Sequence, residues 1–213
     1  MGKLKVGVCV VGSIGTNCYI LTNEDTGEVV IVDPGDEAET ILAHAVGHGE
    51  KLAAILLTHG HFDHILAVNE IKAKWPDAVV YAAEAEKDLL ADPHLNQGYY
   101  DTRACVSADI WVKEGDVIRA GGLSFSVIET PGHTRGSICF YMEAEKLLFA
   151  GDTLFYRSWG RTDLPTGSED DMEFSLARLC TTLPEDVTVL TGHGEMTTIG
   201  FEKKVKGVTG TSE

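Results

Sequence analysis

The stretch THGHFDHI, residues 58–65, places three histidines and one aspartate directly after the apolar run LAAILL. An apolar run of this length is typical of a buried strand, and a loop after a buried strand starts from a fixed backbone. His59 and His61 stand two residues apart, so an extended backbone can project both imidazoles to one side. Asp63 and His64 follow a bend and could serve a second ion. The stretch therefore predicts a metal site.

A metal ion needs three or four donors around it, so the site also requires ligands from distant parts of the chain. Three later segments share one pattern, in which an apolar strand ends at a glycine and a donor side chain follows. These segments are ETPGHTRGS with His133, LLFAGDTLF with Asp152, and VTVLTGHGE with His193. With the four donors of the first stretch they make a set of seven candidate ligands: His59, His61, Asp63, His64, His133, Asp152 and His193.

The chain of 213 residues is long enough to bury a sizeable core. No stretch is proline-rich or low in complexity over a length that would suit a linker, and no repeat is evident. We predict a single domain over residues 1–213, with the metal site built from residues 58–64, 133, 152 and 193.

Apolar periodicity and turn residues predict the elements. Strands are expected at 5–11, 17–22, 28–33, 52–58, 78–83, 109–112, 116–121, 123–130, 137–142, 146–152 and 187–192. Helices are expected at 37–47, 64–75, 84–91, 169–183 and 199–205. Two sheets, each covered by helices on its outer face, satisfy this order of elements. We therefore predict the α/β class and a four-layer αββα sandwich.

The formal net charge of −16 and the pI near 4.8 disfavour nucleic acid and anionic membranes as partners. Five cysteines lie far apart and contain no CxxC, which favours reduced thiols over a disulfide framework. The first residues lack a long apolar segment with a small-residue cleavage site. We therefore expect a cytoplasmic protein that acts on a small molecule.

The motifs THGHFDH, PGHT, AGDT and TGHG, in that order, resemble those of the metallo-β-lactamase fold superfamily over residues 58–194. The segments GDTLF, GRTDLP and TGHGEMTTIGFEK are similar to short, single-domain glyoxalase II-like hydrolases. The resemblance implies an αββα sandwich with the metal site at one edge, between the sheets. It assigns a first metal to His59, His61 and His133, a second to Asp63, His64 and His193, and a bridging position to Asp152.

Such a ligand set predicts hydrolysis with a metal-bridging hydroxide as nucleophile, because two cations lower the pKa of a shared water and stabilise the oxyanion that forms. Asp63 has a second role as a catalytic group that orients the water and takes its proton. The donors suit two divalent ions, with zinc preferred and iron or manganese left open. The resemblance implies a thioester such as S-lactoylglutathione as substrate, and so a thioesterase.

The chain departs from two-domain glyoxalase II enzymes, which add a C-terminal helical domain and place a lysine and a tyrosine after the GDT motif. Here the segment reads TLFYRSWGRTDLPTG, so those glutathione contacts are not carried over. Arg161 could bind a substrate carboxylate, or it could brace its loop through Asp163.

The GRTD segment also resembles persulfide dioxygenases of the same superfamily. Their pattern places a single Fe(II) on His59, His133 and Asp152, with positions left for oxygen and a sulfur substrate. This is the alternative function, in a different reaction class.

Two other regions carry histidines without a complete ligand pattern. His44 and His48 stand four apart but lack the glutamate of HExxH, so we expect surface positions. The segment 92–107 has little regular pattern and is expected to be a surface loop with aromatic anchors, although His94, Tyr99 and Tyr100 could approach a substrate.

Overall fold

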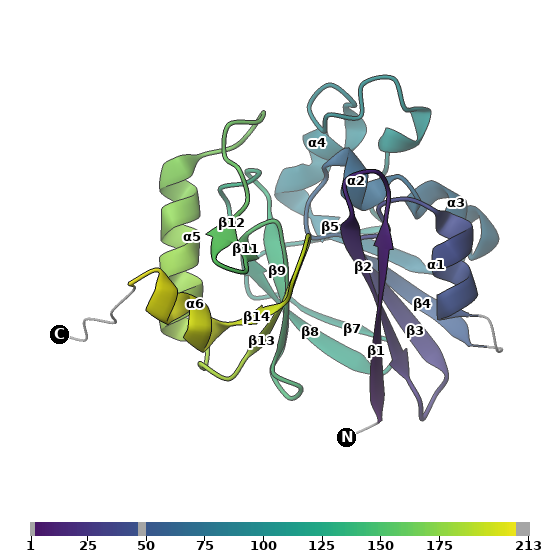
Figure 1. Ribbon diagram of the computed structural model, residues 1–213. Coiled ribbons are helices and arrows are strands. Elements are labelled where there is room, and N and C mark those ends of the chain that lie inside the picture. Colours follow the sequence, from purple (N-terminus) through teal and green to yellow (C-terminus); the bar gives the residue numbers. More distant parts are fainter. Residues whose placement is uncertain (1–2, 47–49, 208–213) are drawn as a thin grey trace.

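Two six-stranded sheets lie face to face at the centre of the computed structural model, which describes residues 3–46 and 50–207 (Figure 1). The first sheet has the order β1 (Leu4–Val11), β2 (Thr16–Asn23), β3 (Glu28–Val32), β4 (Lys51–Leu56), β5 (Val79–Ala83) and β6 (Ile110–Val112). The second has the order β14 (Thr197–Thr198), β13 (Thr188–Thr191), β10 (Leu147–Gly151), β9 (Ile138–Met142), β8 (Leu123–Glu129) and β7 (Val117–Ala120). A small hairpin, β11 (Leu154–Phe155) and β12 (Ser158–Trp159), follows β10.

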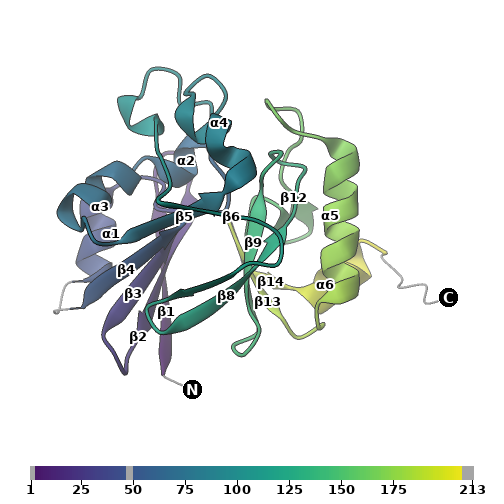
Figure 2. The same cartoon turned by 180° about the vertical axis from the view of Figure 1, so that it is seen from behind.

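Helices cover the outer face of each sheet (Figure 2). The first sheet carries α1 (Ala38–Ala45) and α3 (Val68–Lys74), and the second carries α5 (Glu169–Thr182) and α6 (Ile199–Val205). The short elements are α2 (Phe62–Ile65), α4 (Lys87–Ala91) and two 3₁₀ helices, η1 (Glu84–Glu86) and η2 (Thr102–Ala104). The predicted four-layer αββα sandwich is therefore confirmed.

Three apolar cores separate the four layers. The middle core joins inward side chains of both sheets, such as Leu21, Leu56, Phe125 and Phe149. The other two cores lie under α1 and α3 and under α5 and α6. Strands that are buried on both faces, such as β2, need apolar residues at successive positions rather than alternate ones. That the whole of residues 1–213 forms one domain stays a prediction.

Strand direction brings the predicted donor segments to one edge. In the first sheet β3 runs parallel to β4, and in the second β10 runs parallel to β13. β8 pairs antiparallel with β9, which pairs antiparallel with β10, so β8 and β10 share a direction. The carboxyl ends of β8, β10 and β13 therefore meet at the same edge of their sheet.

One predicted helix is wrong in detail. The helix expected over 64–75 is divided into α2 and α3, because the backbone N–H of Ala67 donates to Pro34 O at 3.0 Å. That bond replaces the one that a continuous helix would make four residues back. Asp63 and His64 consequently lie on α2, a single turn beside the end of β3. None of the helices within residues 3–46 and 50–207 is long and apolar enough to cross a membrane.

Candidate metal centre

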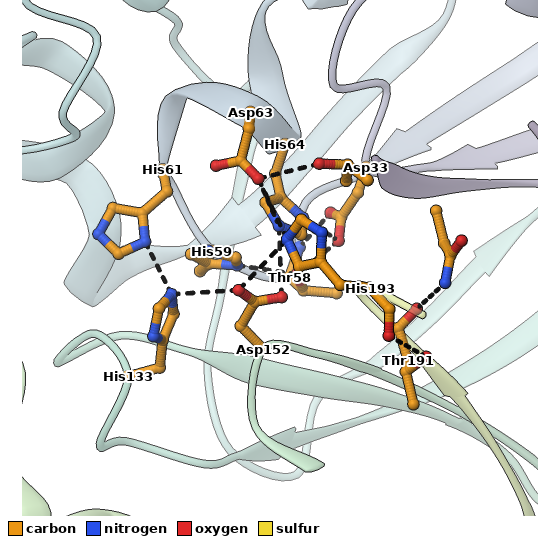
Figure 3. Close-up of polar contacts among 12 residues, drawn as sticks. Asp33, Thr58, His59, His61, Asp63, His64, His133, Asp152, Thr191 and His193 are labelled. Carbon is orange, nitrogen blue, oxygen red and sulfur yellow. Dashed lines mark hydrogen bonds and ion pairs between the residues drawn. The ribbon is translucent and has the colours of Figure 1, made fainter. Parts of the chain in front are cut away.

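Seven histidine and aspartate side chains converge at the edge between the two sheets (Figure 3). The segment after β4 supplies four of them, and the segments after β8, β10 and β13 supply one each. All seven are the residues that the sequence predicted as ligands: His59, His61, Asp63, His64, His133, Asp152 and His193. The structure thus brings both halves of the sandwich together at one point.

The donor atoms form three overlapping groups, in each of which they lie within 4.8 Å of one another. The first group is His59, His61 and His133, and the third is Asp63, His64 and His193. The second joins His59, His64 and Asp152, so it links the other two. Asp152 lies between them: its carboxylate is 3.4 Å from Nε2 of His133, 3.4 Å from that of His64 and 3.5 Å from that of His193.

The three histidines of the first group are held in their neutral form. Burial lowers the pKa of His61 to about 3 and also lowers the pKa values of His59 and His133. Nδ1 of His61 and Nε2 of His133 lie 2.8 Å apart. Neutral imidazoles offer a lone pair, which is the form that binds a cation.

The third group combines two histidines with one carboxylate, and Asp152 of the second group lies beside it. Burial would lower the pKa of His64, but Asp63 and Asp152 outweigh it and raise that pKa. Burial would likewise raise the pKa of Asp63, but His64 and a hydrogen bond with His193 hold it below its ordinary value. Nε2 of His193 lies 3.2 Å from Oδ2 of Asp63. Asp63 is therefore an ionised carboxylate, as a metal ligand must be.

The polar atoms at the centre of the cluster fit a cation. Among the described residues, five buried side-chain atoms make no hydrogen bond, and four of these belong to the donors. The four are Nε2 of His59, His61 and His64, and Oδ1 of Asp152. A buried polar atom without a hydrogen bond is costly, and a bound cation would offset that cost for all four atoms. Imidazole and carboxylate donors suit a divalent metal such as zinc, iron or manganese.

Asp33 and Thr58 orient two of the histidines, although the sequence did not identify them as part of the site. Oδ1 of Asp33 accepts from the backbone N–H of Thr58 at 2.8 Å, and Oδ2 accepts from its hydroxyl at 2.6 Å. The same Oδ2 lies 3.0 Å from Nδ1 of His64, and the Thr58 hydroxyl lies 3.2 Å from Nδ1 of His59. A carboxylate behind a histidine fixes its tautomer and its direction.

Residues at the start of β2 form hydrogen bonds that connect the two sheets beside the donors. The Thr16 hydroxyl donates to Oδ2 of Asp63 at 2.9 Å. The Asn17 amide donates to the carbonyls of Thr191 and Gly194, at 3.0 Å each, and so brackets His193. These residues lie far from the motifs along the chain, so no sequence pattern pointed to them.

Glu86 joins the two loops that carry the first group. Its buried carboxylate accepts from the backbone N–H of Gly60 at 2.7 Å and from that of Gly136 at 2.8 Å. Gly60 lies between His59 and His61, and Gly136 lies three residues after His133. Burial raises the pKa of Glu86, and these hydrogen bonds oppose that rise.

Two of the predicted glycines allow the close approach that the site needs. A Cβ on Gly192 would lie 2.1 Å from Oδ1 of Asp152. Gly151 has φ +47°, and a Cβ there would lie 2.3 Å from the Thr58 hydroxyl. The pattern of strand, glycine and donor thus has a steric cause at both positions.

A cavity of about 390 Å³ opens onto the cluster. Five of the donors line it, together with Ile14, Phe62, Gln97, Arg161 and Leu164. The Arg161 side chain makes a bidentate pair with Asp163, at 2.7 Å for each bond, which is the bracing arrangement considered from the sequence. Its backbone carbonyl accepts from Nδ1 of His133 at 2.7 Å, so Arg161 also orients a donor. Its contact with an anionic substrate stays a prediction.

The remaining predicted positions lie away from the cluster. His44 is exposed on α1, as expected, and His48 lies outside the described residues. In the segment 92–107, Tyr99 is 51% exposed and Tyr100 is 98% exposed, so the expected aromatic anchors are wrong. Asn96 is a buried polar residue of that loop, and its side-chain amide donates hydrogen bonds to the carbonyls of Leu89 and Ala104.

The sequence pattern of the metallo-beta-lactamase superfamily matches residues 11–193. The chain therefore belongs to this superfamily and is a metal-dependent hydrolase within it. It is 38% identical to the probable metallo-hydrolase YqgX of Bacillus subtilis, over 91% of this chain and 92% of that protein. It is 31% identical to the hydroxyacylglutathione hydrolase GloC of Haemophilus influenzae, over 94% of this chain and 96% of that protein.

Solved structures share the fold. The chain is similar to BLEG-1 B3 metallo-beta-lactamase, with a TM-score of 0.85 and 38% identity, over 97% of this chain and 100% of that one. It is similar to TTHA1623 in a di-iron-bound form, with a TM-score of 0.81 and 34% identity, over 93% of this chain and 98% of that one. It is also similar to ETHE1 from Myxococcus xanthus, with a TM-score of 0.79 and 28% identity, over 94% of this chain and 82% of that one.

Proposed function

We propose that the protein is a binuclear metallo-hydrolase that cleaves small thioesters, with S-lactoylglutathione as the representative substrate. The observation that carries the proposal is the complete set of seven donors, arranged in three groups that overlap through His59 and His64, beside a cavity of about 390 Å³. The likeness to GloC, whose name describes a hydroxyacylglutathione hydrolase, supports the thioester class.

In this proposal His59, His61 and His133 hold one divalent cation, and Asp63, His64 and His193 hold the other. Asp152 would be available to both cations, since its carboxylate approaches histidines of both groups. We expect zinc, because imidazole and carboxylate donors suit it. Iron is the alternative metal, and the similar protein TTHA1623 has been solved in a di-iron-bound form.

When bound, a pair of divalent cations lowers the pKa of a water molecule and polarises a carbonyl group. The residues of the chain then place the reactants. Asp63 borders the cavity, and its Thr16 and His193 contacts hold it toward the donors, so it is placed to accept a proton from water. Because its pKa is lowered, Asp63 is a weak base, so its main contribution to the reaction is to orient the water molecule.

The test is the loss of thioester absorbance from S-lactoylglutathione, with the protein loaded separately with zinc, manganese or iron. We expect turnover by the wild type and by His44→Ala, which removes an exposed histidine, and none by His59→Ala, which removes a buried donor. Absence of turnover with every metal would contradict the thioesterase assignment.

The alternative function is that of a persulfide dioxygenase with one Fe(II) on His59, His133 and Asp152. The likeness to ETHE1 is the observation that favours it. His133 and Asp152 approach to 3.4 Å, and His59 shares one donor group with each of them. Oxygen consumption with glutathione persulfide that survives His193→Ala would support this alternative, because that variant removes a donor of the other group only.

A further inference from the structure

A second cavity of about 280 Å³ adjoins the metal cavity. The two share the lining residues Ile14, Phe62, Asp63 and Gln97, so they are continuous at the mouth of the site. The second cavity extends away from the donors, between the turn after β1 and the segment from Gln97 to Arg103. Apart from Asp63, which borders both cavities, the donors and the proposed chemistry do not use this space.

The loop that lines both cavities through Gln97 is held in place by several hydrogen bonds. The Asn96 side chain donates to the carbonyls of Leu89 and Ala104, at 3.1 and 2.6 Å, and accepts from the N–H of Gly98 at 2.9 Å. The Asn96 carbonyl accepts from the N–H of Phe62 at 2.9 Å, which ties the loop to the first turn of α2. The loop is therefore fixed in position against the helix that carries Asp63.

Gln97 follows this anchor with φ +67°, a left-handed backbone that is uncommon outside glycine. Its amide Oε1 accepts from the Tyr99 hydroxyl at 2.8 Å, and its Nε2 donates to the His94 carbonyl at 3.2 Å. The side chain is thus an oriented polar group at the point where the two cavities meet. Backbone strain of this kind is often kept at positions that contact ligands.

The charges of the second cavity disfavour a polyphosphate. Among the described residues that line it, Arg103 is the one cation, against the carboxylates of Asp36, Asp63 and Asp101. The Arg103 guanidinium already donates to Asp101 through Nε and Nη2, at 3.1 and 2.8 Å, and to Asp36 through Nη1 at 2.7 Å. Its charge is therefore matched, and amide groups are better partners for this space than phosphates.

We propose that the substrate site is bipartite, with the thioester carbonyl in the metal cavity and the thiol portion in the second cavity, where Gln97 selects a short peptide-like thiol. This inference rests on the proposed thioesterase function and deepens it. A small hydroxyacyl group fits within the metal cavity, so the longer thiol portion is the part that needs the adjoining space. Gln97 is a specificity residue: its amide pairs with a peptide group of the thiol and does not touch the reacting carbonyl.

The experiment compares lactoyl thioesters of glutathione, N-acetylcysteamine and coenzyme A, with wild type, Gln97→Ala, Gln97→Asn and Tyr100→Ala. The wild type should prefer the glutathione ester over the coenzyme A ester. In Gln97→Ala the KM for the glutathione ester should rise about five- to tenfold, the effect of one lost hydrogen bond, with kcat unchanged. The KM for the N-acetylcysteamine ester, which is too short to need the second cavity, should stay within about twofold.

Two variants separate a contact from a structural effect. Gln97→Asn keeps the amide and tolerates a left-handed backbone, so it should recover part of the affinity. Tyr100→Ala removes a side chain that is 98% exposed and lines neither cavity, so it should behave as the wild type. An equal change in KM for the glutathione and N-acetylcysteamine esters in Gln97→Ala, or no change in either, would overturn the proposal.

A binding measurement separates this inference from the proposed function. S-methylglutathione is not a thioester, and calorimetry gives its Kd without any turnover. We expect that Kd to rise about five- to tenfold in Gln97→Ala. If no thioester is hydrolysed with any metal, the proposed function fails, and an unchanged Kd for S-methylglutathione then overturns the cavity assignment as well.

Discussion

Three histidines of the centre each meet a second polar group through Nδ1, which sets the direction of the ring. Nδ1 of His133 donates to the Arg161 carbonyl, and Nδ1 of His64 faces Asp33. Nδ1 of His59 lies beside the Thr58 hydroxyl. The opposite ring nitrogens of these histidines are thereby left to point into the cluster, which is where cations would bind.

The prediction at this scale concerns Asp33. Asp33→Asn keeps the shape of the side chain but removes a charge behind His64 and weakens the bond from the Thr58 hydroxyl. We expect a loss of metal affinity of about 10- to 100-fold, the usual effect of removing a group that orients a metal-binding histidine. Competition with a chromophoric chelator measures it. Asp25→Asn, at an exposed position in the turn after β2, serves as the control and should bind metal as the wild type does.

The donors could be predicted from the sequence because their residue types and spacing are unusual together. Asp33 carried a usable signal, since it follows an apolar strand just as Asp152 does, although no glycine precedes it. Asn17 and Glu86 carried none. An asparagine or a glutamate is common at any turn, and only the folded chain shows that these two lie beside the ligand loops.

At the scale of the elements, the metal centre requires that two ligand-bearing loops lie at a fixed distance from each other. The loop after β4 and the loop after β8 belong to different sheets, and Glu86 at the end of η1 accepts a backbone N–H from each. Both of these N–H groups lie on glycines whose Cβ would approach Glu86 to 3.2 Å or less. One buried carboxylate therefore sets the distance between His61 and His133.

Glu86→Gln is expected to disturb this arrangement, because a carboxamide has one acceptor oxygen and its NH₂ would face one of the two N–H groups. One buried N–H then loses its partner, so the free energy of unfolding should fall by about 1–3 kcal/mol. We also expect weaker metal binding by the first group of histidines. Urea denaturation and metal analysis measure the two effects. Glu84→Gln, at an exposed position in the same 3₁₀ helix, is the matched control. A wild-type metal content in Glu86→Gln would contradict the bridging role.

Most strands and long helices agree with the sequence pattern to within two residues, because apolar periodicity reports burial directly. The division between α2 and α3 could not be predicted. It depends on the Pro34 carbonyl, which comes from a loop thirty-odd positions earlier and takes the Ala67 N–H. The short strands β11, β12 and β14 were also missed, since two residues carry no period.

At the scale of the whole molecule, the centre is a link between the two sheets. Four donors come from the side of the first sheet and three from the side of the second. Ligands that bind only the folded state stabilise it in proportion to their affinity. Bound cations should therefore contribute to global stability as well as to activity.

Removal of metal should lower the melting temperature by about 5 to 10 °C, the effect of a ligand present at about a hundred times its Kd on a chain of this length. Calorimetry of the protein before and after treatment with a chelator measures the change, and added zinc should reverse it. In His59→Ala the shift should shrink, because one donor group is incomplete. Equal melting temperatures with and without metal in the wild type would refute the role of the centre as a link.

The residues at the opening of the metal cavity come from different segments of the chain than the donors do. Ile14, Gln97, Arg161 and Leu164 border the opening, and they come from three segments that carry none of the seven donors. Side-chain substitutions in those segments can change what enters the cavity without replacing a ligand. Recognition and chemistry can thus diverge independently in descendants of this chain, and one reactive centre can be kept while its range of substrates is exchanged.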